Sequence, residues 1–247
     1  MPHELLFLPL LFFIAFLYAS VGHGGASGYL AVMALFSISP VFMKPSALIL
    51  NILVSGVAFI QYYRKGFFRW KLFLPFAIAS FPFAFLGATV PVSAELYKII
   101  LAVCLLIACG RMFFINQTKS LEIQPVNYFI AVLCGIIIGF VSGMIGIGGG
   151  ILLSPLLVLT RWSDLKTASA VSALFIFVNS ISGVVGVYQN EISFPSHFYS
   201  WILFAFAGGV LGSFLGAGKM NQTWLKYILL FVLVIAVVKL LVTIQWV

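Results

Sequence analysis

Long apolar segments, each about the length of a membrane-crossing helix, follow one another along almost the whole chain. They occupy the windows 5–21, 45–63, 72–90, 97–115, 127–147, 167–187, 199–217 and 224–246. A helix needs roughly 20 apolar residues to cross the hydrocarbon core of a bilayer. Lipid tolerates only helices and closed barrels, and the windows lack the strict alternation of barrel strands. The sequence therefore predicts an all-α, multi-pass membrane protein folded as a helical bundle.

The composition agrees with this prediction and narrows the function. Only 7% of the 247 residues are charged and 63% are hydrophobic, whereas soluble domains carry about 25% charged residues. The formal net charge of +8 comes from basic residues strung between the windows, so we expect no nucleic-acid partner. The cysteines, Cys104, Cys109 and Cys134, lie inside apolar windows without the spacing of a disulfide or metal site, and we expect no cofactor.

Two glycine clusters interrupt the apolar pattern at related places. The first, GHGGASG, covers residues 22–28, and the second, GIGGG, covers residues 146–150. At a constant spacing of 124 residues, Gly22 matches Gly146, Gly24 matches Gly148 and Gly25 matches Gly149. Lys44 likewise matches Lys166 at a spacing of 122. The order and spacing of these residues indicate that the chain consists of two related halves.

The lysines and arginines indicate how many elements each half contains. If each glycine cluster separates a descending segment from a returning one, each half has five elements, and ten basic residues face one side of the membrane against three on the other. If each cluster lies within one continuous crossing, the split is seven against six. Cytoplasmic loops collect lysine and arginine, which favours the first arrangement, with both termini outside. Full crossings and re-entrant hairpins give the same count, so both stay open.

Because each half has an odd number of elements, each element of the second half must run across the membrane in the direction opposite to its counterpart in the first half. The sequence thus predicts two inverted repeats, residues 1–115 and 127–247, joined by a cytoplasmic linker at 116–126. About eight full transmembrane helices, with short or broken helices at the glycine clusters, would make up the bundle. In transporters, inverted repeats of this kind hold the substrate near the middle of the membrane.

Consecutive glycines in an apolar segment indicate more than helix packing, because each weakens a helix by about 1 kcal/mol. Each cluster leads into a short apolar segment, and the free N–H groups at the start of a helix favour an anion. The candidate binding residues at the clusters are Gly22, His23, Gly24, Gly25, Ser27, Gly146, Gly148, Gly149 and Gly150. Glycines spaced by four, such as Gly135, Gly139 and Gly143, are instead typical of close helix packing.

Polar side chains near the clusters could complete an anion site. His23 could transfer a proton, donate to an oxyanion, or simply bond to a nearby carbonyl. Asn51, Ser169, Ser172 and Asn179 lie in neighbouring windows and could either surround an oxyanion or join helices. The five acidic residues all lie in a terminus or in loops. Their position disfavours a cation channel and coupling through a buried carboxylate.

The motifs GHGGASG and GIGGGILLSPLL, together with KTASAVSALFIFVNSISG and GGVLGSFLGA, resemble the TauE/SafE family of sulfite exporters. The resemblance covers nearly the whole chain. It implies a transporter of the bacterial cytoplasmic (inner) membrane that moves sulfite, sulfonates or related sulfur anions, outward or inward.

We therefore expect a secondary transporter of a small sulfur-containing anion in the lipid bilayer, held near the two glycine clusters. A homodimer is one option for its assembly, and the sequence does not select it. A passive anion channel is the first alternative. An intramembrane enzyme is disfavoured, because no histidine–acid pair, HExxH motif or serine with a nearby base lies at membrane depth.

Overall fold

The computed structural model describes most of the chain. The described residues are 2–36, 38, 40–90, 106, 122–188, 194, 197–221, 223, 224, 227, 228, 230, 231, 234 and 238. Within them the regular secondary structure is helical, with eight α-helices and no strand. The class is therefore all-α, as the sequence predicts. All but residue 106 of the window at 97–115 and most of the window at 224–246 lie outside the described residues.

The helices differ in length. In chain order they are α1 (Pro2–Ser20), α2 (Ala26–Leu35), α3 (Pro40–Arg64), α4 (Trp70–Thr89), α6 (Tyr128–Ile145), α7 (Gly150–Leu159), α8 (Leu165–Val187) and α9 (Phe198–Gly218). Helices α3, α4, α6, α8 and α9 are long and apolar enough to cross a membrane. Helices α2 and α7 have 10 residues each. At about 1.5 Å per residue they reach only about half of a hydrocarbon core.

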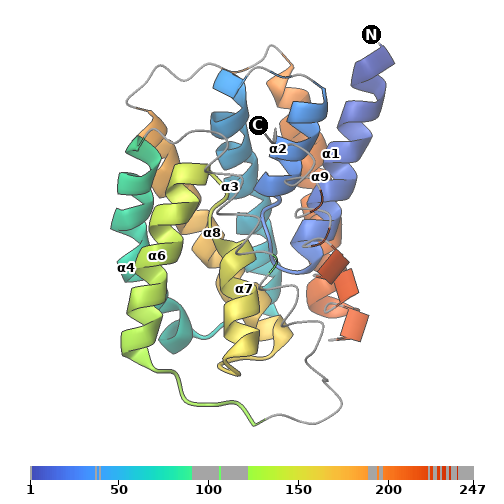
Figure 1. The fold of residues 1–247 in the computed structure, drawn as a ribbon. Coiled ribbons are helices and arrows are strands. Elements are labelled where there is room, and N and C mark those ends of the chain that lie inside the picture. Colours follow the sequence, from blue (N-terminus) through green and yellow to red (C-terminus); the bar gives the residue numbers. More distant parts are fainter. Residues whose placement is uncertain are drawn as a thin grey trace.

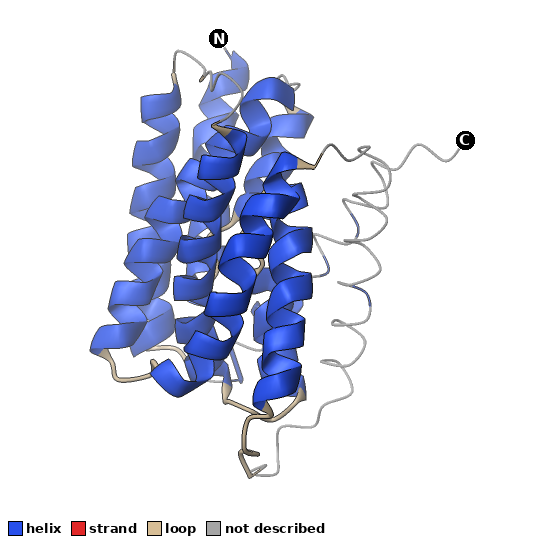
Figure 2. Ribbon diagram, turned by 90° about the vertical axis from the view of Figure 1, so that its left-hand side faces the viewer, coloured by secondary structure: helices blue, strands red, loops and turns tan. Residues whose placement is uncertain are grey.

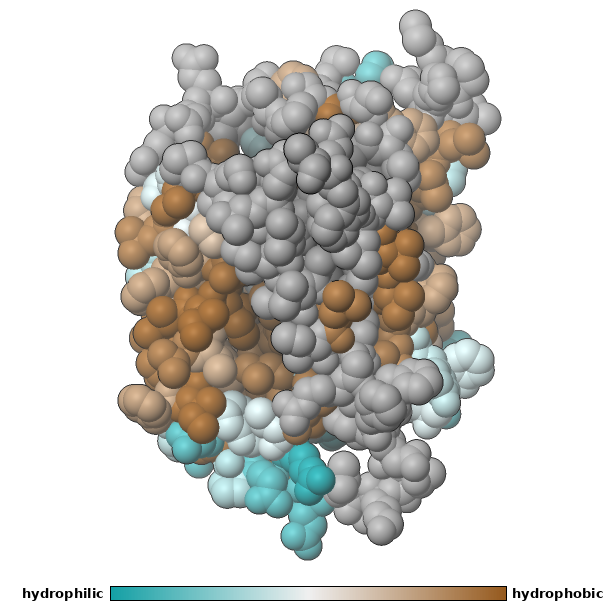
Figure 3. Space-filling view, viewed as in Figure 1, coloured by the Kyte–Doolittle hydropathy of each residue, from teal (hydrophilic) through white to brown (hydrophobic). Residues whose placement is uncertain are grey.

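The outward faces of the helices are apolar. Ile78, Phe129 and Tyr199 are all at least 70% exposed. Figure 3 shows hydrophobic residues on the flanks of the bundle and hydrophilic ones gathered at its lower end. A surface of this kind suits lipid and would aggregate in water. Together with the five candidate spans it identifies a multi-pass membrane protein, whereas the number of eight full crossings stays a prediction.

The helices run roughly parallel to the long axis of the bundle (Figure 2). In the view of Figure 1, α1 descends from the N-terminus, α2 returns upward, α3 descends and α4 ascends. The second set runs the other way: α6 ascends, α7 descends, α8 ascends and α9 descends. Each helix of the second set thus runs opposite to the helix at the same place in the first set.

The lower end of the bundle in Figure 1 is the basic end. The Gln124 N–H donates to the Arg161 carbonyl at 2.9 Å, and the Lys166 ammonium lies 4.9 Å from the centre of the Phe67 ring, so three connecting segments meet there. Seven of the eight lysines and arginines in the described residues belong to this end: Arg64, Lys65, Arg69, Lys71, Arg161, Lys166 and Lys219. The eighth, Lys44, lies near the start of α3 at the opposite end.

Glycines allow two helix pairs to approach closely. Gly135, Gly139 and Gly143 of α6 lie against the backbone of α4, and a Cβ added to Gly139 would come within 2.5 Å of the Ser80 carbonyl oxygen. In the other pair, Gly208, Gly212 and Gly216 of α9 lie against the backbone of α1. Both glycine series therefore pack helices together and do not face the breaks described below.

The packing pairs correspond between the two sets of helices. Helix α4 packs on α6 and on α8, while α9 packs on α1 and on α3. The short helices also correspond, with α2 against α3 and α7 against α8, and α3 packs on α8 in the centre. Exchanging α1–α4 with α6–α9 maps each of these pairs onto another or onto itself. This correspondence is what inverted repeats require, although the two repeats and their division at 116–126 stay a prediction.

Candidate functional site

Both glycine clusters interrupt the helices. We call residues 21–25, between α1 and α2, the first break, and residues 146–149, between α6 and α7, the second break. The glycines with left-handed backbone conformation in the breaks are Gly22 (φ +73°), Gly25 (φ +96°), Gly146 (φ +80°), Gly148 (φ +73°) and Gly149 (φ +76°). Side-chain-bearing residues rarely adopt this conformation, so glycine is what allows the chain to reverse within so few residues.

Asn51, in the middle of α3, joins the two breaks. Its Oδ1 accepts a hydrogen bond from the Ala26 N–H at 3.0 Å, at the end of the first break. Its Nδ2 donates to the Ile147 carbonyl at 3.2 Å, in the second break, and to the Ser180 hydroxyl at 3.4 Å. An amide nitrogen has two hydrogens, so both donors are used within the protein. Asn51 therefore holds the breaks together and has no free donor for a ligand.

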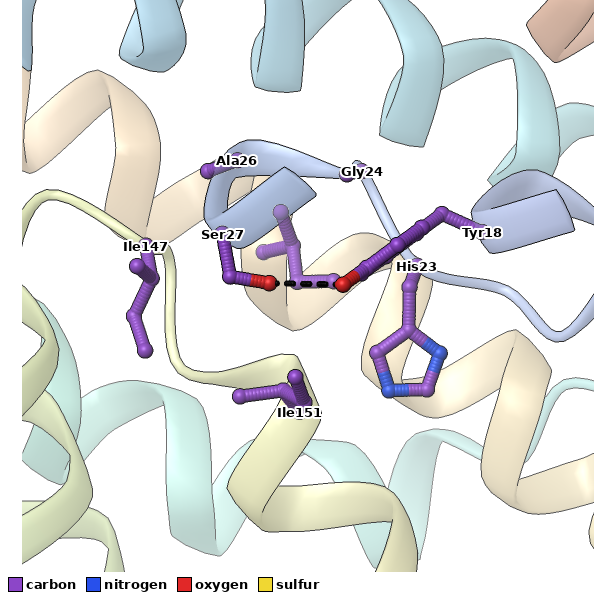
Figure 4. A pocket seen from close by; sticks show the side chains of 9 residues that line it. Tyr18, His23, Gly24, Ala26, Ser27, Ile147 and Ile151 are labelled. Carbon is purple, nitrogen blue, oxygen red and sulfur yellow. Dashed lines mark hydrogen bonds between the residues drawn. The ribbon is translucent and has the colours of Figure 1, made fainter. Parts of the chain in front are cut away.

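A small pocket lies between the breaks (Figure 4). Its lining residues are Tyr18, His23, Gly24, Gly25, Ala26, Ser27, Ile147, Ile151 and Ile176. In Figure 4, His23 and Ile147 stand on opposite sides, Ile151 lies below, and the joined hydroxyls of Tyr18 and Ser27 lie above. The pocket is partly open and has room for about one water molecule. A larger guest requires neighbouring side chains to move.

His23 is a polar group of the pocket with unused hydrogen-bonding capacity. The side chain is 1% exposed, and its Nδ1 lies 3.0 Å from the Val21 carbonyl oxygen. A carbonyl only accepts, so Nδ1 must carry the hydrogen of this bond. Nε2 is buried beside the backbone of Gly150 and completes no hydrogen bond with the described part of the chain. A buried polar atom left in this way costs about 1–3 kcal/mol, which marks it for a ligand, water or proton.

Further polar groups surround the first break. The hydroxyls of Tyr18 and Ser27 lie 2.9 Å apart, and either can donate. The Tyr29 hydroxyl is fully buried, has no partner among the described residues, and lies beside Gly25. Within those same residues the N–H groups of Ser27 and Gly28, in the first turn of α2, have no acceptor. The first break therefore offers hydroxyl, imidazole and backbone groups, several of which can donate.

The second break is apolar on its pocket side and basic on its far side. Ile147 and Ile151 face the pocket. On the other side the Lys44 ammonium donates to the Met144 carbonyl at 3.2 Å and to the Ala88 carbonyl at 3.4 Å, and so binds the last turns of α6 and α4. A cation at the C-terminal end of a helix is favoured by its dipole. The sequence analysis treated Lys44 only as a positive charge in a loop. Its match with Lys166 was a signal that this lysine has a defined structural role.

Three other predicted residues lie around the breaks but do not line the pocket. The Ser169 hydroxyl donates to the Leu165 carbonyl of its own helix at 2.8 Å, and the Ser169 backbone contacts Gly22. Ser172 accepts from the Ser154 hydroxyl of α7 at 2.7 Å. Asn179 turns toward α4, where its Oδ1 accepts from Ser80 at 2.9 Å, while its Nδ2 is buried without a partner in the described residues. Their contacts join α8 to its neighbours.

Comparisons with known proteins add independent information. A family model described as "Sulfite exporter TauE/SafE" matches residues 7–240. A "probable membrane transporter protein" of Sinorhizobium fredii is 34% identical over 246 residues, covering 98% of this chain and 100% of that protein. Another "probable membrane transporter protein", from Methanocaldococcus jannaschii, is 29% identical over 197 residues, covering 73% of this chain and 72% of that protein. No solved structure matches the chain.

Proposed function

Because the chain belongs to the TauE/SafE sulfite exporter family and is a membrane transporter, we propose that it is a secondary transporter of a small sulfur-containing anion, such as sulfite or an organosulfonate. The observation that carries the proposal is the pocket between the breaks, whose polar side chains come from the first break and from the ends of α1 and α2 beside it. The proposal places the anion against His23, Ser27 and the first turn of α2.

The chemistry of the pocket favours an anion over a cation. No acidic residue lines it, whereas it contains two hydroxyls, an imidazole and the N-terminal end of α2. A hydrogen bond to a charged group contributes about 1.5–3 kcal/mol, and the helix end adds about 0.3–1 kcal/mol or more where water is excluded. Two or three such bonds suffice for the modest affinity that a transporter needs in order to release its substrate.

The size of the pocket indicates that binding involves movement. There is room for about one water molecule, and a sulfite or sulfonate group is larger. Ile151 on α7 and Ile176 on α8 border the space, so a small displacement of α7 would enlarge it. We infer that the structure represents a closed arrangement. Opening toward either end of the bundle would follow from rearrangement of the two breaks.

We further propose that the two halves, residues 1–115 and 127–247, act as inverted repeats in the bacterial inner membrane. The opposed helix directions and the corresponding packing pairs support this. The basic end would face the cytoplasm and both termini the outside. In a background without the native cysteines, Lys65→Cys should resist a membrane-impermeant thiol reagent added outside whole cells. Labelling of this position from outside would reverse the orientation.

Reconstitution tests the function directly. The purified chain in proteoliposomes should take up labelled sulfite or a small sulfonate with saturable kinetics, and unlabelled substrate on the far side should stimulate uptake. Such trans-stimulation is expected of a carrier and not of a passive channel. Absence of saturable flux for all these anions, with the fold verified by thermal unfolding, would overturn the proposal. Flux without trans-stimulation would indicate that the protein is a passive channel and not a carrier.

A further inference from the structure

We propose that each anion passes the pocket together with one proton, which is shared between the anion and Nε2 of His23. The inference rests on the proposed function and adds the coupling ion to it. The observations are the fixed tautomer of His23, its unpartnered Nε2, and the position of the ring between the two breaks.

The hydrogen bond to Val21 fixes the state of the ring. Nδ1 carries a hydrogen because the Val21 carbonyl, 3.0 Å away, can only accept. In a neutral imidazole the other nitrogen, Nε2, is then a bare acceptor. An anion also presents acceptors, so a neutral His23 would repel it. A stable contact between the two therefore requires a proton between them.

The proton can come from either partner. A sulfonate is always an anion near neutral pH, so Nε2 must first take a proton from solution and bind the sulfonate as an imidazolium. Sulfite can form a complex with the same single shared proton in two ways. Either hydrogen sulfite binds to the neutral ring, or the sulfite dianion binds to the imidazolium. No other bond forms or breaks. The proton arrives from the side where the anion enters and leaves with it on the other side.

No fixed charge near His23 can replace this proton. The other titratable groups beside the first break in the described residues are tyrosines: Tyr18 on α1, whose ring centre is 6.4 Å from that of His23, Tyr29 on α2, which lies against Gly25, and Tyr62 on α3, which donates to the Ser20 carbonyl. Helices α7 and α8 contribute Ile151 and Ile176 to the pocket.

The lysines described on α3 and α8 do not line the pocket and are engaged elsewhere. The Lys44 ammonium of α3 binds the carbonyls of Ala88 and Met144, and the Lys166 ammonium of α8 lies over the Phe67 ring.

Burial gives the shared proton a physical advantage. Transfer of a lone ion into a medium of low dielectric constant is strongly unfavourable, and even in proteins it costs several kcal/mol per ion. A sulfonate paired with an imidazolium carries no net charge. The pair therefore meets a lower barrier between the two breaks than the anion alone would, which links movement of the anion to movement of the proton.

Proteoliposomes that contain a pH-sensitive dye test the inference. Inward flux of methanesulfonate through the wild-type protein should acidify the lumen by about one proton per anion, since one His23 binds one proton. His23→Gln places a permanent amide donor near the position of Nε2 but cannot take up a proton, so methanesulfonate flux should be slower than in the wild type and its proton-to-anion ratio should fall toward zero. His197→Gln, at the start of α9 and away from the pocket, is the matched control and should keep the wild-type ratio.

Sulfite provides a second readout. Hydrogen sulfite that enters releases protons and acidifies the lumen, whereas the dianion alone would take up protons and make the lumen alkaline. The pH change in protein-free liposomes is subtracted from both. Methanesulfonate flux without protons, alkalinisation by sulfite, or an unchanged ratio in His23→Gln would each overturn the inference and leave the proposed function standing. Absence of flux for both anions in the wild type would overturn the proposed function, and this inference with it.

Discussion

The first and second breaks reverse the chain with similar glycine conformations but present different side chains to the pocket. At the spacing of 124 residues, His23 corresponds to Ile147 and Ser27 to Ile151, and all four line the same pocket. One half thus supplies polar groups and the other an apolar wall. On this basis we propose a single anion site, whose polar side is formed by the first break and the helices beside it. The second break shapes it, and Asn51 holds it in place.

The largest effect is expected where an added methyl group meets backbone. In Gly22→Ala the new Cβ would overlap the Ser169 carbonyl, on a residue with φ +73°. In Gly146→Ala it would lie 2.8 Å from Cγ of Lys44, a side chain that can move. Gly66→Ala is the control, since its φ is +78° and nothing lies within 4 Å.

The expected order of destabilisation is Gly22→Ala, then Gly146→Ala, then Gly66→Ala. The control carries only the conformational penalty, about 1–2 kcal/mol, and overlap with backbone adds about 1–3 kcal/mol at Gly22. Thermal unfolding in detergent measures the order. Equal shifts for Gly22→Ala and Gly66→Ala would show that the first break is not held against α8.

Loss of the link between the breaks should have an effect of similar size. Asn51→Ala removes the partner of the Ala26 N–H and of the Ile147 carbonyl, each of which then costs about 1–3 kcal/mol. Ser55→Ala, one turn further along α3, deletes a buried hydroxyl that has no partner among the described residues, and should be neutral or stabilising. If both variants unfold at the same temperature, Asn51 does not join the breaks.

Exchange of the unequal residues tests the comparison itself. His23→Ile gives the first break the side chain that the second break has, so the fold should persist while anion flux falls at least about tenfold, through loss of a charged hydrogen bond of about 1.5–3 kcal/mol. Flux and thermal unfolding are measured on the same preparation. Unchanged flux with an intact fold would show that the anion does not bind at the first break.

The smallest effect is expected at Ser27. Ser27→Ala removes the neutral hydrogen bond to Tyr18, which contributes about 0.5–1.5 kcal/mol. The Tyr18 hydroxyl is then free to donate to the anion in place of Ser27, so the apparent affinity should fall only about two- to tenfold. Ser213→Ala serves as the control, because its hydroxyl donates within α9 to the Gly209 carbonyl at 2.7 Å. Equal losses in the two variants would assign the effect of Ser27 to packing.

The sequence located the helices well because their signal is local. The windows at 72–90, 127–147 and 199–217 lie within two residues of α4, α6 and α9 at both ends, since a run of apolar residues of the right length has few other structures in lipid. The interruptions at the two glycine clusters were equally visible. Both signals depend on residues that are neighbours in the chain.

Contacts between distant segments were not readable in this way. The series Ala205, Gly209, Ser213 and Ala217 has helix-packing spacing, yet the glycines nearest the α1 backbone are the adjacent Gly208, Gly212 and Gly216. Which of two neighbouring faces meets α1 depends on the rotation of α9, and a repeat of small residues leaves that rotation open. The role of Lys44 could not be predicted from the sequence for the same reason. The carbonyl groups to which it donates belong to residues 44 and 100 positions further along the chain.

By itself, the sequence determined that this chain enters lipid, where its helices break, and that one break carries a histidine while the other carries an isoleucine. These properties follow from hydrophobic length and from the residue type at single positions. Only the tertiary structure decided that both breaks meet at Asn51, and that Nδ1 of His23 is committed to Val21 while Nε2 is left without a partner. Such facts depend on where groups far apart in the chain come to lie, because a hydrogen bond forms only at short distance and in the right direction.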